Sequence, residues 1–170
     1  MVFVLARVFV SAAVLCVGGS ASRADSPRES PWDHEVRSPS GHCIARAEAG
    51  ASRIVASRLV GRRMETLWTL PGYRSFYALA DDCRTLVVIF DGANLLDLDD
   101  CKASTVVFTF YENAREVRQI TLGELYPDLT VLERTVSHFN WYRSTGWTSR
   151  GWTVESVDGR TLTFDDHPRR

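Results

Sequence analysis

The chain after position 34 is a succession of short apolar segments separated by turn residues. In most of these segments apolar and polar positions alternate with the period of two that a half-buried β-strand shows. Gly, Pro, Asp and Asn lie between them, as expected for connecting turns. The predicted strands are His42–Ala47, Arg53–Leu59, Glu65–Leu70, Thr85–Phe90, Thr105–Tyr111, Glu116–Leu122, Val136–Tyr142, Trp152–Val157 and Arg160–Phe164.

Two of the segments are apolar almost throughout. Leu86–Phe90 and Thr105–Tyr111 are rich in β-branched and aromatic residues, a pattern typical of strands that are covered on both faces. The clearest hairpin signal is Asp158-Gly159 between the last two strands. A two-residue turn of this kind needs positive φ at both central positions.

Helical signals are confined to one place. Leu122–Tyr126 and Leu129–Glu133 could each form a helical turn, separated by Pro127. The predicted fold class is therefore mainly β, with antiparallel hairpins packed as a small sandwich or open barrel and at most two short helices. We expect a single β domain over residues 34–166, preceded by a flexible segment at 25–33 and followed by a frayed tail at 167–170.

The first 24 residues have the parts of a secretory signal. Arg7 precedes the apolar run Val8–Val17, which is too short for the roughly 20 residues of a membrane-spanning helix. Small residues before Asp25 predict cleavage after Ala24 and a secreted or periplasmic protein. An uncleaved anchor, or a lipoprotein attached through Cys16, is the alternative. The preference for Arg over Lys is typical of a GC-rich bacterial genome.

Length, charge and composition exclude several classes of protein. Removing residues 1–24 from the 170 leaves 146, about one domain. The Lys+Arg count of 20 falls to 18 without Arg7 and Arg23, against 21 Asp+Glu, so the net charge becomes about −3. A broad basic surface for nucleic acid is therefore not expected. The hydrophobic fraction of 45% and the aromatic content exclude a disordered chain. No second apolar run reaches membrane-spanning length.

Three cysteines remain after processing, and an oxidising compartment permits disulfides. Cys83 and Cys101 are placed symmetrically about Gly92, with an apolar segment on either side of that glycine. Folded as a hairpin, these segments would bring the two cysteines together, so we predict a Cys83–Cys101 disulfide. Cys43 is then left unpaired. The alternative is three reduced thiols.

Three turn segments share a form, a small or acidic turn followed by the start of a strand: Ser38–Ile44, Leu79–Leu86 and Ser156–Leu162. A period near 40 residues with several strands per unit resembles the blade repeat of β-propellers. Ala80–Asp99 resembles the middle of such a blade. The resemblance to blade-like repeats in small exported bacterial proteins implies packed blade-like sheets. At about 40 residues per blade, 146 residues are too few for a closed ring of four blades.

Recognisable catalytic motifs are absent from the sequence. There is no Gly-x-Ser-x-Gly, His-Glu-x-x-His or Cys-x-x-Cys, and no cofactor or metal is expected. Of the four His residues, two lie near the flexible ends, His42 directly follows a turn, and only His138 lies in the interior of a predicted strand. A small hydrolase that uses His138 with Asp128 or Glu133 remains an alternative.

An acidic segment offers oxygen atoms for Ca²⁺. Asp91, Asp97, Asp99 and Asp100 lie close together in the chain, but without the spacing of a calcium loop. Alternation places Asp97 and Asp99 on one face of a strand, as in an exposed sheet face.

The aromatic side chains are concentrated in Phe139–Trp152, which holds three Trp and one Tyr. Trp and Tyr fill β cores, anchor protein interfaces or stack on sugars. Alternation predicts that Phe139 and Trp141 belong to the core and that Trp147 is exposed. The candidate binding residues are therefore Tyr142, Arg143, Trp147 and Arg150.

The function that these observations favour is a non-enzymatic exported β domain that acts as a binding or accessory structural module. Its partner would be an unidentified protein or glycan. A cell-wall or glycan-binding module that uses exposed aromatic side chains is one alternative, and the hydrolase around His138 is the other.

Overall fold

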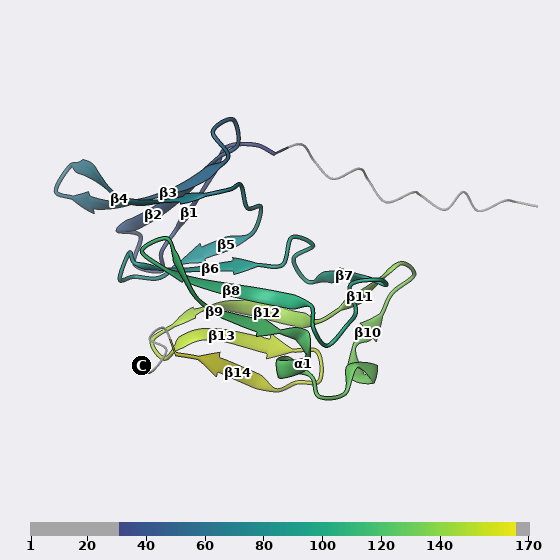
Figure 1. Ribbon diagram of the computed structural model, residues 1–170. Helices are drawn as coiled ribbons and strands as arrows, with labels where there is room; N and C mark the ends of the chain where they lie inside the picture. The colour runs from purple at the N-terminus through teal and green to yellow at the C-terminus, as the bar shows by residue number, and fades with distance from the viewer. Residues whose placement is uncertain (1–30, 166–170) are drawn as a thin grey trace, which may run out of the picture. The chain divides into compact units, whose positions relative to one another are not determined.

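Strands dominate the part of the chain that the computed structural model describes, residues 31–165 (Figure 1). The predicted signal segment and the tail at 167–170 lie outside these residues. The elements are β1 His34–Arg37, β2 Cys43–Glu48, β3 Arg53–Val60, β4 Arg63–Pro71, β5 Tyr77–Leu79, β6 Thr85–Ile89, β7 Leu95–Asp97, β8 Val106–Glu112, β9 Arg115–Thr121, α1 Leu122–Leu125, a 3-10 turn Leu129–Val131, β10 Glu133–Arg134, β11 His138–Asn140, β12 Tyr142–Thr148, β13 Gly151–Ser156 and β14 Thr161–Phe164.

The strands form four sheets in which every pair of neighbours is antiparallel. Their orders are β1-β2-β3-β4, β5-β6-β8-β9, β10-β11-β7 and β12-β13-β14. None of the described sheets closes into a barrel. The mainly β class that the alternating pattern predicts is therefore confirmed, with small packed sheets as the architecture.

Strand β6 is covered on both faces, as its continuous apolar run predicts. Leu86 and Val88 belong to one core cluster together with residues of β2, β3 and β4. Val87, between them, belongs to a second cluster that contains residues of β8, β9 and β13. Because successive side chains of a strand point to opposite faces, β6 separates two cores. Figure 1 shows β6 and β8 lying between β1–β4 and β12–β14.

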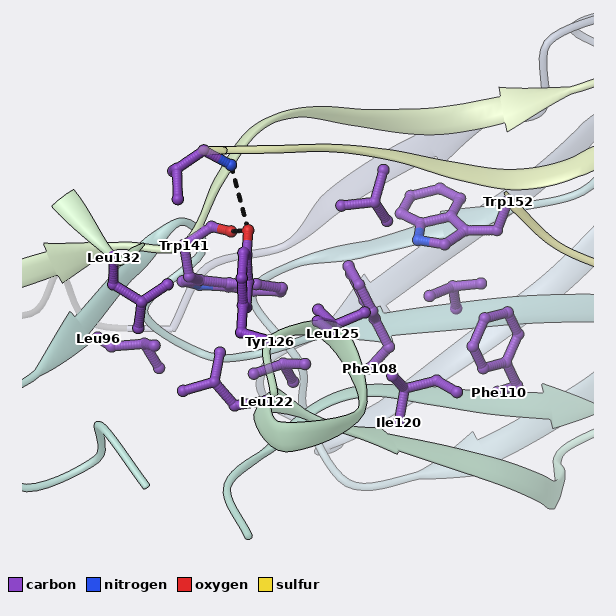
Figure 2. Packing of buried hydrophobic residues seen from close by; sticks show 14 residues of the cluster. Leu96, Phe108, Phe110, Ile120, Leu122, Leu125, Tyr126, Leu132, Trp141 and Trp152 are labelled. Atoms are coloured by element: carbon purple, nitrogen blue, oxygen red, sulfur yellow. Dashed lines mark hydrogen bonds between the residues drawn. The ribbon is translucent and has the colours of Figure 1, made fainter. Parts of the chain in front are cut away.

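The second core is rich in aromatic rings (Figure 2). The ring of Phe108 lies 5.1 Å from that of Trp141 and 5.8 Å from that of Trp152, measured between centroids. Tyr126 reaches into this core and donates a hydrogen bond from its hydroxyl to the carbonyl oxygen of Trp141. The same hydroxyl accepts from the backbone N–H of Val157 at 3.2 Å. One side chain thus satisfies two buried backbone groups.

Both helical turns occur where the sequence predicts them. Thr121 caps α1 and makes a capping box with Glu124, each side chain bonding the other residue's backbone N–H. The 3-10 turn begins after Asp128, whose carboxylate accepts from the backbone N–H of Thr130 at 2.9 Å. Pro127 separates the two turns, because it lacks the N–H that a continuous helix would need.

The final hairpin also forms, but its turn is wider than the predicted two residues. The last strand pair joins Glu155 to Thr161. Within the turn Gly159 has a φ of 83°, whereas Asp158 is not among the residues with positive φ. The Asp158 carboxylate instead accepts from the Ser156 hydroxyl at 2.5 Å and from Arg160 Nε at 2.7 Å. These side-chain bonds stabilise the wider turn.

The predicted hairpin around Gly92 does not form. β6 pairs with β5 and β8, and β7 pairs with the distant β11. The apolar segments that flank Gly92 therefore belong to two different sheets.

The predicted disulfide between Cys83 and Cys101 is wrong for the same reason. Cys83 is bonded to Cys43, with their Cα atoms 5.3 Å apart and a separation of 40 positions along the chain. Cys101 is a free, partly buried thiol, and burial raises its pKa. The disulfide joins the start of β2 to the turn that precedes β6.

Hydrogen bonds also join the turn before β2 to the turn before β6. Ser40 donates to the Asp81 carboxylate from its backbone N–H at 2.8 Å and from its hydroxyl at 2.5 Å. The first two turn segments of the sequence repeat therefore lie side by side. The resemblance to propeller blades itself stays a prediction.

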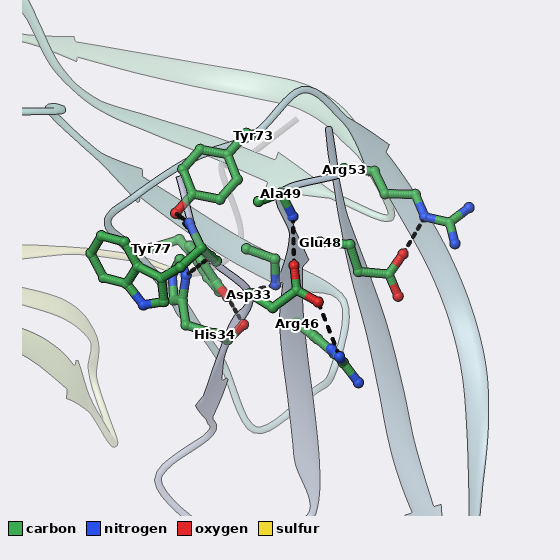
Figure 3. Close-up of polar contacts among 10 residues, drawn as sticks. Asp33, His34, Arg46, Glu48, Ala49, Arg53, Tyr73 and Tyr77 are labelled. Carbon is green, nitrogen blue, oxygen red and sulfur yellow. Dashed lines mark hydrogen bonds and ion pairs between the residues drawn. The ribbon is translucent and has the colours of Figure 1, made fainter. Parts of the chain in front are cut away.

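The last residues of the expected flexible segment are held against the first sheet (Figure 3). The Asp33 carboxylate accepts from the Ala49 backbone N–H at 2.9 Å and from Arg46 at 3.1 Å. Tyr77 lies nearby, and its hydroxyl donates to the His34 carbonyl oxygen at 3.1 Å. Burial raises the pKa of Tyr77 to about 12, so this hydroxyl stays protonated and keeps donating.

Candidate functional site

A group of exposed apolar side chains lies at the end of the β3–β4 hairpin. β2 accompanies β3 only as far as the pair of Cys43 with Arg58. One residue beyond that pair, the Leu59 N–H still donates to the His42 carbonyl oxygen at 2.9 Å, and from Val60 onward β3 is paired, among the described strands, with β4 alone. The hairpin end therefore projects past the rest of its sheet, at the left of Figure 1.

Three large apolar side chains project from this end. Leu59 is 45% exposed, Val60 46% and Met64 47%. Leu59 is paired with Met64 across the hairpin, so these two side chains share one face. Val60 is paired with Arg63 at the next position and points to the opposite face. Both faces of the hairpin end are consequently apolar in part.

Basic side chains surround these apolar ones. Arg58, Arg62 and Arg63 are all exposed, and the only acidic neighbour within the hairpin end is Glu65. Glu65 forms an ion pair with Arg58 at 3.6 Å. Among residues 31–165, no hydrogen bond or ion pair engages the guanidinium groups of Arg62 and Arg63. We call residues 58–64 the apolar–basic tip.

The sequence predicts that Trp147 lies in an exposed loop. In the structure Trp147 lies within β12. It is paired with Trp152 of β13, and the two rings meet edge to face with centroids 5.4 Å apart. Its indole Nε1 is buried without a hydrogen-bond partner in the described structure. The ring packs against the second core. The prediction of an exposed Trp147 is therefore wrong.

Tyr142 is also largely a packing residue. Its ring lies edge to face on Trp141 at 4.6 Å between centroids, and it contacts the second core. Burial raises the pKa of its phenol. Trp141 is fully buried, as the alternation predicts, and Phe139 packs against the same core.

The two predicted binding arginines differ in their surroundings. Arg143 donates to the Val157 carbonyl oxygen at 2.8 Å and to Glu133 at 3.4 Å, so it connects β12 to other parts of the fold. Arg150 lies exposed in the turn between β12 and β13. Tyr142, Arg143, Trp147 and Arg150 thus do not form one exposed aromatic surface.

His138 meets a carboxylate that the sequence did not suggest. Its Nε2 lies 2.8 Å from Asp97 Oδ1, and its Nδ1 lies 2.8 Å from the hydroxyl of Ser137. The predicted partners are engaged elsewhere: Asp128 caps the 3-10 turn and Glu133 contacts Arg143. The acidic segment and His138 come together because β7 pairs with β11, residue Asp97 opposite His138.

This arrangement has the order serine, histidine, carboxylate. If His138 donates its Nε2 proton to Asp97, its Nδ1 can accept the proton of the Ser137 hydroxyl. The group lies near the surface, since Ser137 is exposed and the Asp97 side chain is 60% exposed. Strong activation of a nucleophile generally requires a site that excludes water.

One group of side chains of the types that bind metals lies close together in the described chain. His42, Cys43 and Cys83 have ligand atoms within 4.8 Å of one another. Both sulfur atoms belong to the disulfide, and a disulfide sulfur is not the thiolate that binds metals. Among residues 31–165 the acidic segment Asp91–Asp100 does not supply a second group of this kind.

Sequence reasoning did not single out the apolar–basic tip. The predicted strands end at Leu59 and resume at Glu65, which leaves the tip in a connection. A signal was nevertheless present, because Leu59, Val60 and Met64 flank Gly61 and continue the pattern of both strands. Gly61 has a φ of 63° and makes the turn.

The described residues contain no helix with the length and hydropathy needed to cross a membrane. No protein-family model, curated protein or solved structure matches this chain.

Proposed function

We propose that this protein is an exported, non-enzymatic binding module that contacts its partner through the apolar–basic tip. The observation that carries the proposal is the exposure of Leu59, Val60 and Met64, each close to half exposed, at the end of one hairpin. Exposed apolar side chains that cluster, with polar groups around them, are typical of interaction sites. Isolated ones need no such explanation.

Export is supported by two features. The first is the signal-like pattern of residues 1–24, with its short apolar run. The second is the Cys43–Cys83 disulfide, since such bonds persist in oxidising compartments. Both features support the proposal of a secreted or periplasmic location.

Strand pairing and a buried inner end fix the conformation of the hairpin, including its tip, in the absence of a ligand. Its strands are paired from Arg53 with Pro71 to Val60 with Arg63. At the inner end, Ile54 and Trp68 are buried in the first core, and the Trp68 indole donates to the Cys83 carbonyl oxygen at 2.9 Å. A partner therefore meets a preformed surface and pays little ordering entropy.

Retention on cell envelopes of the source organism tests the proposal. We expect the secreted protein to be retained, and a Leu59→Ser, Met64→Ser double variant to lose most of that retention. Val136→Ser is the matched control, because Val136 is 99% exposed but lies in the connection between β10 and β11. Equal retention of the wild-type protein and the tip variant would contradict the proposal.

A second candidate function, ester hydrolysis, is favoured by the contacts of His138 with Ser137 and Asp97. In this reaction the Ser137 oxygen would attack the ester carbonyl while its proton passes to His138 Nδ1. That proton would then go to the leaving alcohol, and water would release the acyl group. Labelling with a fluorophosphonate tests it: an adduct on Ser137 that is lost in His138→Asn would support hydrolysis, and an unlabelled protein would exclude it.

A further inference from the structure

We infer that the partner of the apolar–basic tip is the surface of an anionic phospholipid bilayer. This inference rests on the proposed function and names the chemistry of its partner. It is argued from the two-sided exposure of the tip, from its backbone pairing and from its charge.

The apolar side chains of the tip point to both faces of a two-stranded hairpin. Leu59 and Met64 occupy one face, and Val60 occupies the other. A flat protein surface would cover only one of these faces and leave the other in water. A bilayer interface surrounds an inserted tip on every side, so it can cover all three side chains at once.

The length of the tip fits the depth of a lipid interface. From Arg58 to the turn at Gly61 the chain advances three residues, about 10 Å at the strand rise of roughly 3.3 Å per residue. Amphipathic helices that lie in the interface bury their apolar face about 5–10 Å deep, and the tip can reach a comparable depth. Val60 is paired with Arg63 across the hairpin, and the Leu59 N–H donates to the His42 carbonyl oxygen at 2.9 Å, so these strand residues enter the interface with backbone partners. This matters because unpaired backbone groups are costly in lipid.

The charge of the tip selects the lipid. Arg62 and Arg63 lie at the very end of the hairpin, and their long aliphatic stems let the guanidinium groups reach back to the lipid phosphates when the apolar side chains of the tip enter the interface. Arg58 lies further back and is paired with Glu65. Anionic lipids attract each nearby Arg with an effect of about fivefold in affinity. The tip is therefore basic although the chain as a whole has a formal net charge of −1.

Cosedimentation with lipid vesicles tests the inference. The protein is used as secreted and processed by its source organism, so that every variant has the same N-terminus. We expect it to bind vesicles of phosphatidylcholine mixed equally with phosphatidylglycerol, to bind phosphatidylcholine alone much more weakly, and to dissociate as salt is raised.

Two variants separate the apolar and the basic contributions. Arg62→Gln with Arg63→Gln should weaken binding to the mixed vesicles about 25-fold. Leu59→Ser with Met64→Ser should weaken it on both kinds of vesicle. Val136→Ser should bind as the wild-type protein does. Near-ultraviolet circular dichroism confirms that each variant is folded, as expected for changes at exposed positions.

Each remaining outcome has a definite meaning. Failure of the wild-type protein to bind mixed vesicles, or full binding by the tip variants, would overturn the lipid inference. If the tip still governs retention on cell envelopes in that case, the proposed function stands and its partner is a protein or glycan. Self-association that is lost in the Leu59→Ser, Met64→Ser variant would identify a second copy of the chain as the partner and would also overturn the lipid inference.

Discussion

His138 Nε2 and Asp97 Oδ1 lie 2.8 Å apart across the pair of strands β11 and β7. The two residues are 41 positions apart in the chain, and their contact joins the acidic segment to the aromatic region. The histidine side chain is 20% exposed and the aspartate 60%, so water screens the pair from one side.

We expect this contact to contribute little to stability. A double-mutant cycle of Asp97→Asn and His138→Asn, followed by urea unfolding, should give a coupling free energy below about 1 kcal/mol, as for polar contacts at other exposed positions. A coupling above about 2 kcal/mol would mean that the pair is held in a far drier environment than its exposure indicates.

The Cys43–Cys83 disulfide should be a major contributor to stability. Its cysteines are 40 residues apart, and closing a loop of that length restricts the unfolded chain by about 4 kcal/mol in the chain-entropy model. Cys43→Ala with Cys83→Ala should lower the free energy of unfolding by roughly this amount. Cys101→Ser is the control and should cost about 1 kcal/mol or less, because Cys101 is only partly buried.

Peptide mapping checks the pairing directly. In the unreduced protein, alkylation should label Cys101 and leave Cys43 and Cys83 unlabelled. Recovery of a peptide in which Cys83 is joined to Cys101 would restore the pairing that the sequence suggested.

Removing the Tyr126 hydroxyl should destabilise the second core. In Tyr126→Phe, the Trp141 carbonyl oxygen and the Val157 N–H lose their partner. Each is a buried backbone group, so we expect a loss of about 1–3 kcal/mol in urea unfolding. Tyr73→Phe is the matched control. Its hydroxyl bonds the exposed Trp32, so the loss should be below about 1 kcal/mol. If the two variants lost the same free energy of unfolding, the burial of the bonded backbone groups would not determine the size of the loss.

The Ser40–Asp81 contact predicts an acid-sensitive element of stability. The hydrogen bonds that Ser40 donates hold the pKa of Asp81 below its usual value. A carboxyl group with a lowered pKa in the folded state favours folding above its unfolded pKa of 3.8. That contribution disappears as the pH falls through the lower, folded value.

Ser40→Ala should therefore raise the pKa of Asp81, as measured by NMR titration of its carboxyl carbon. The stability difference between this variant and the wild type should be present at neutral pH and shrink below about pH 4. A difference that grows on acidification would contradict the assignment.

Trp147 should behave as a packing residue. Because its ring meets Trp152 edge to face and its Nε1 is buried, Trp147→Ala should lower the free energy of unfolding by about 2–3 kcal/mol. Titration of the tryptophan fluorescence with a panel of soluble glycans should produce no saturable change. A saturable response that Trp147→Phe abolishes would instead revive the glycan-binding alternative.

The sequence by itself determined the elements that depend on local pattern. The continuous apolar run of β6 predicted its burial on both faces, and Leu86 and Val87 indeed face different cores. Alternation placed Trp141 in the core, where it is fully buried, although the predicted strand Val136–Tyr142 is divided into β11 and β12 at this residue. Pro127 and the turn residues around it predicted two short helical turns. Each of these follows from the period of a strand or from the backbone limits of proline.

The tertiary structure alone decided which strands are neighbours. Alternation says which face of a strand is buried but not which strand lies beside it. Pairing strands that are distant in sequence costs little additional free energy, because the entropy cost of closing a loop grows only with the logarithm of its length. The neighbouring segments around Gly92 thus separate, Cys83 pairs with Cys43, and Asp97 meets His138.

The exposure of the apolar–basic tip is also decided by the tertiary structure. Leu59, Val60 and Met64 are ordinary strand residues by pattern. They are exposed because the segment that leads into β2 is last bonded to β3 at Leu59, and the hairpin end beyond it has no further neighbour among the described strands of the sheet. Local sequence can predict a strand, but the exposure of its end depends on where the adjacent strand stops.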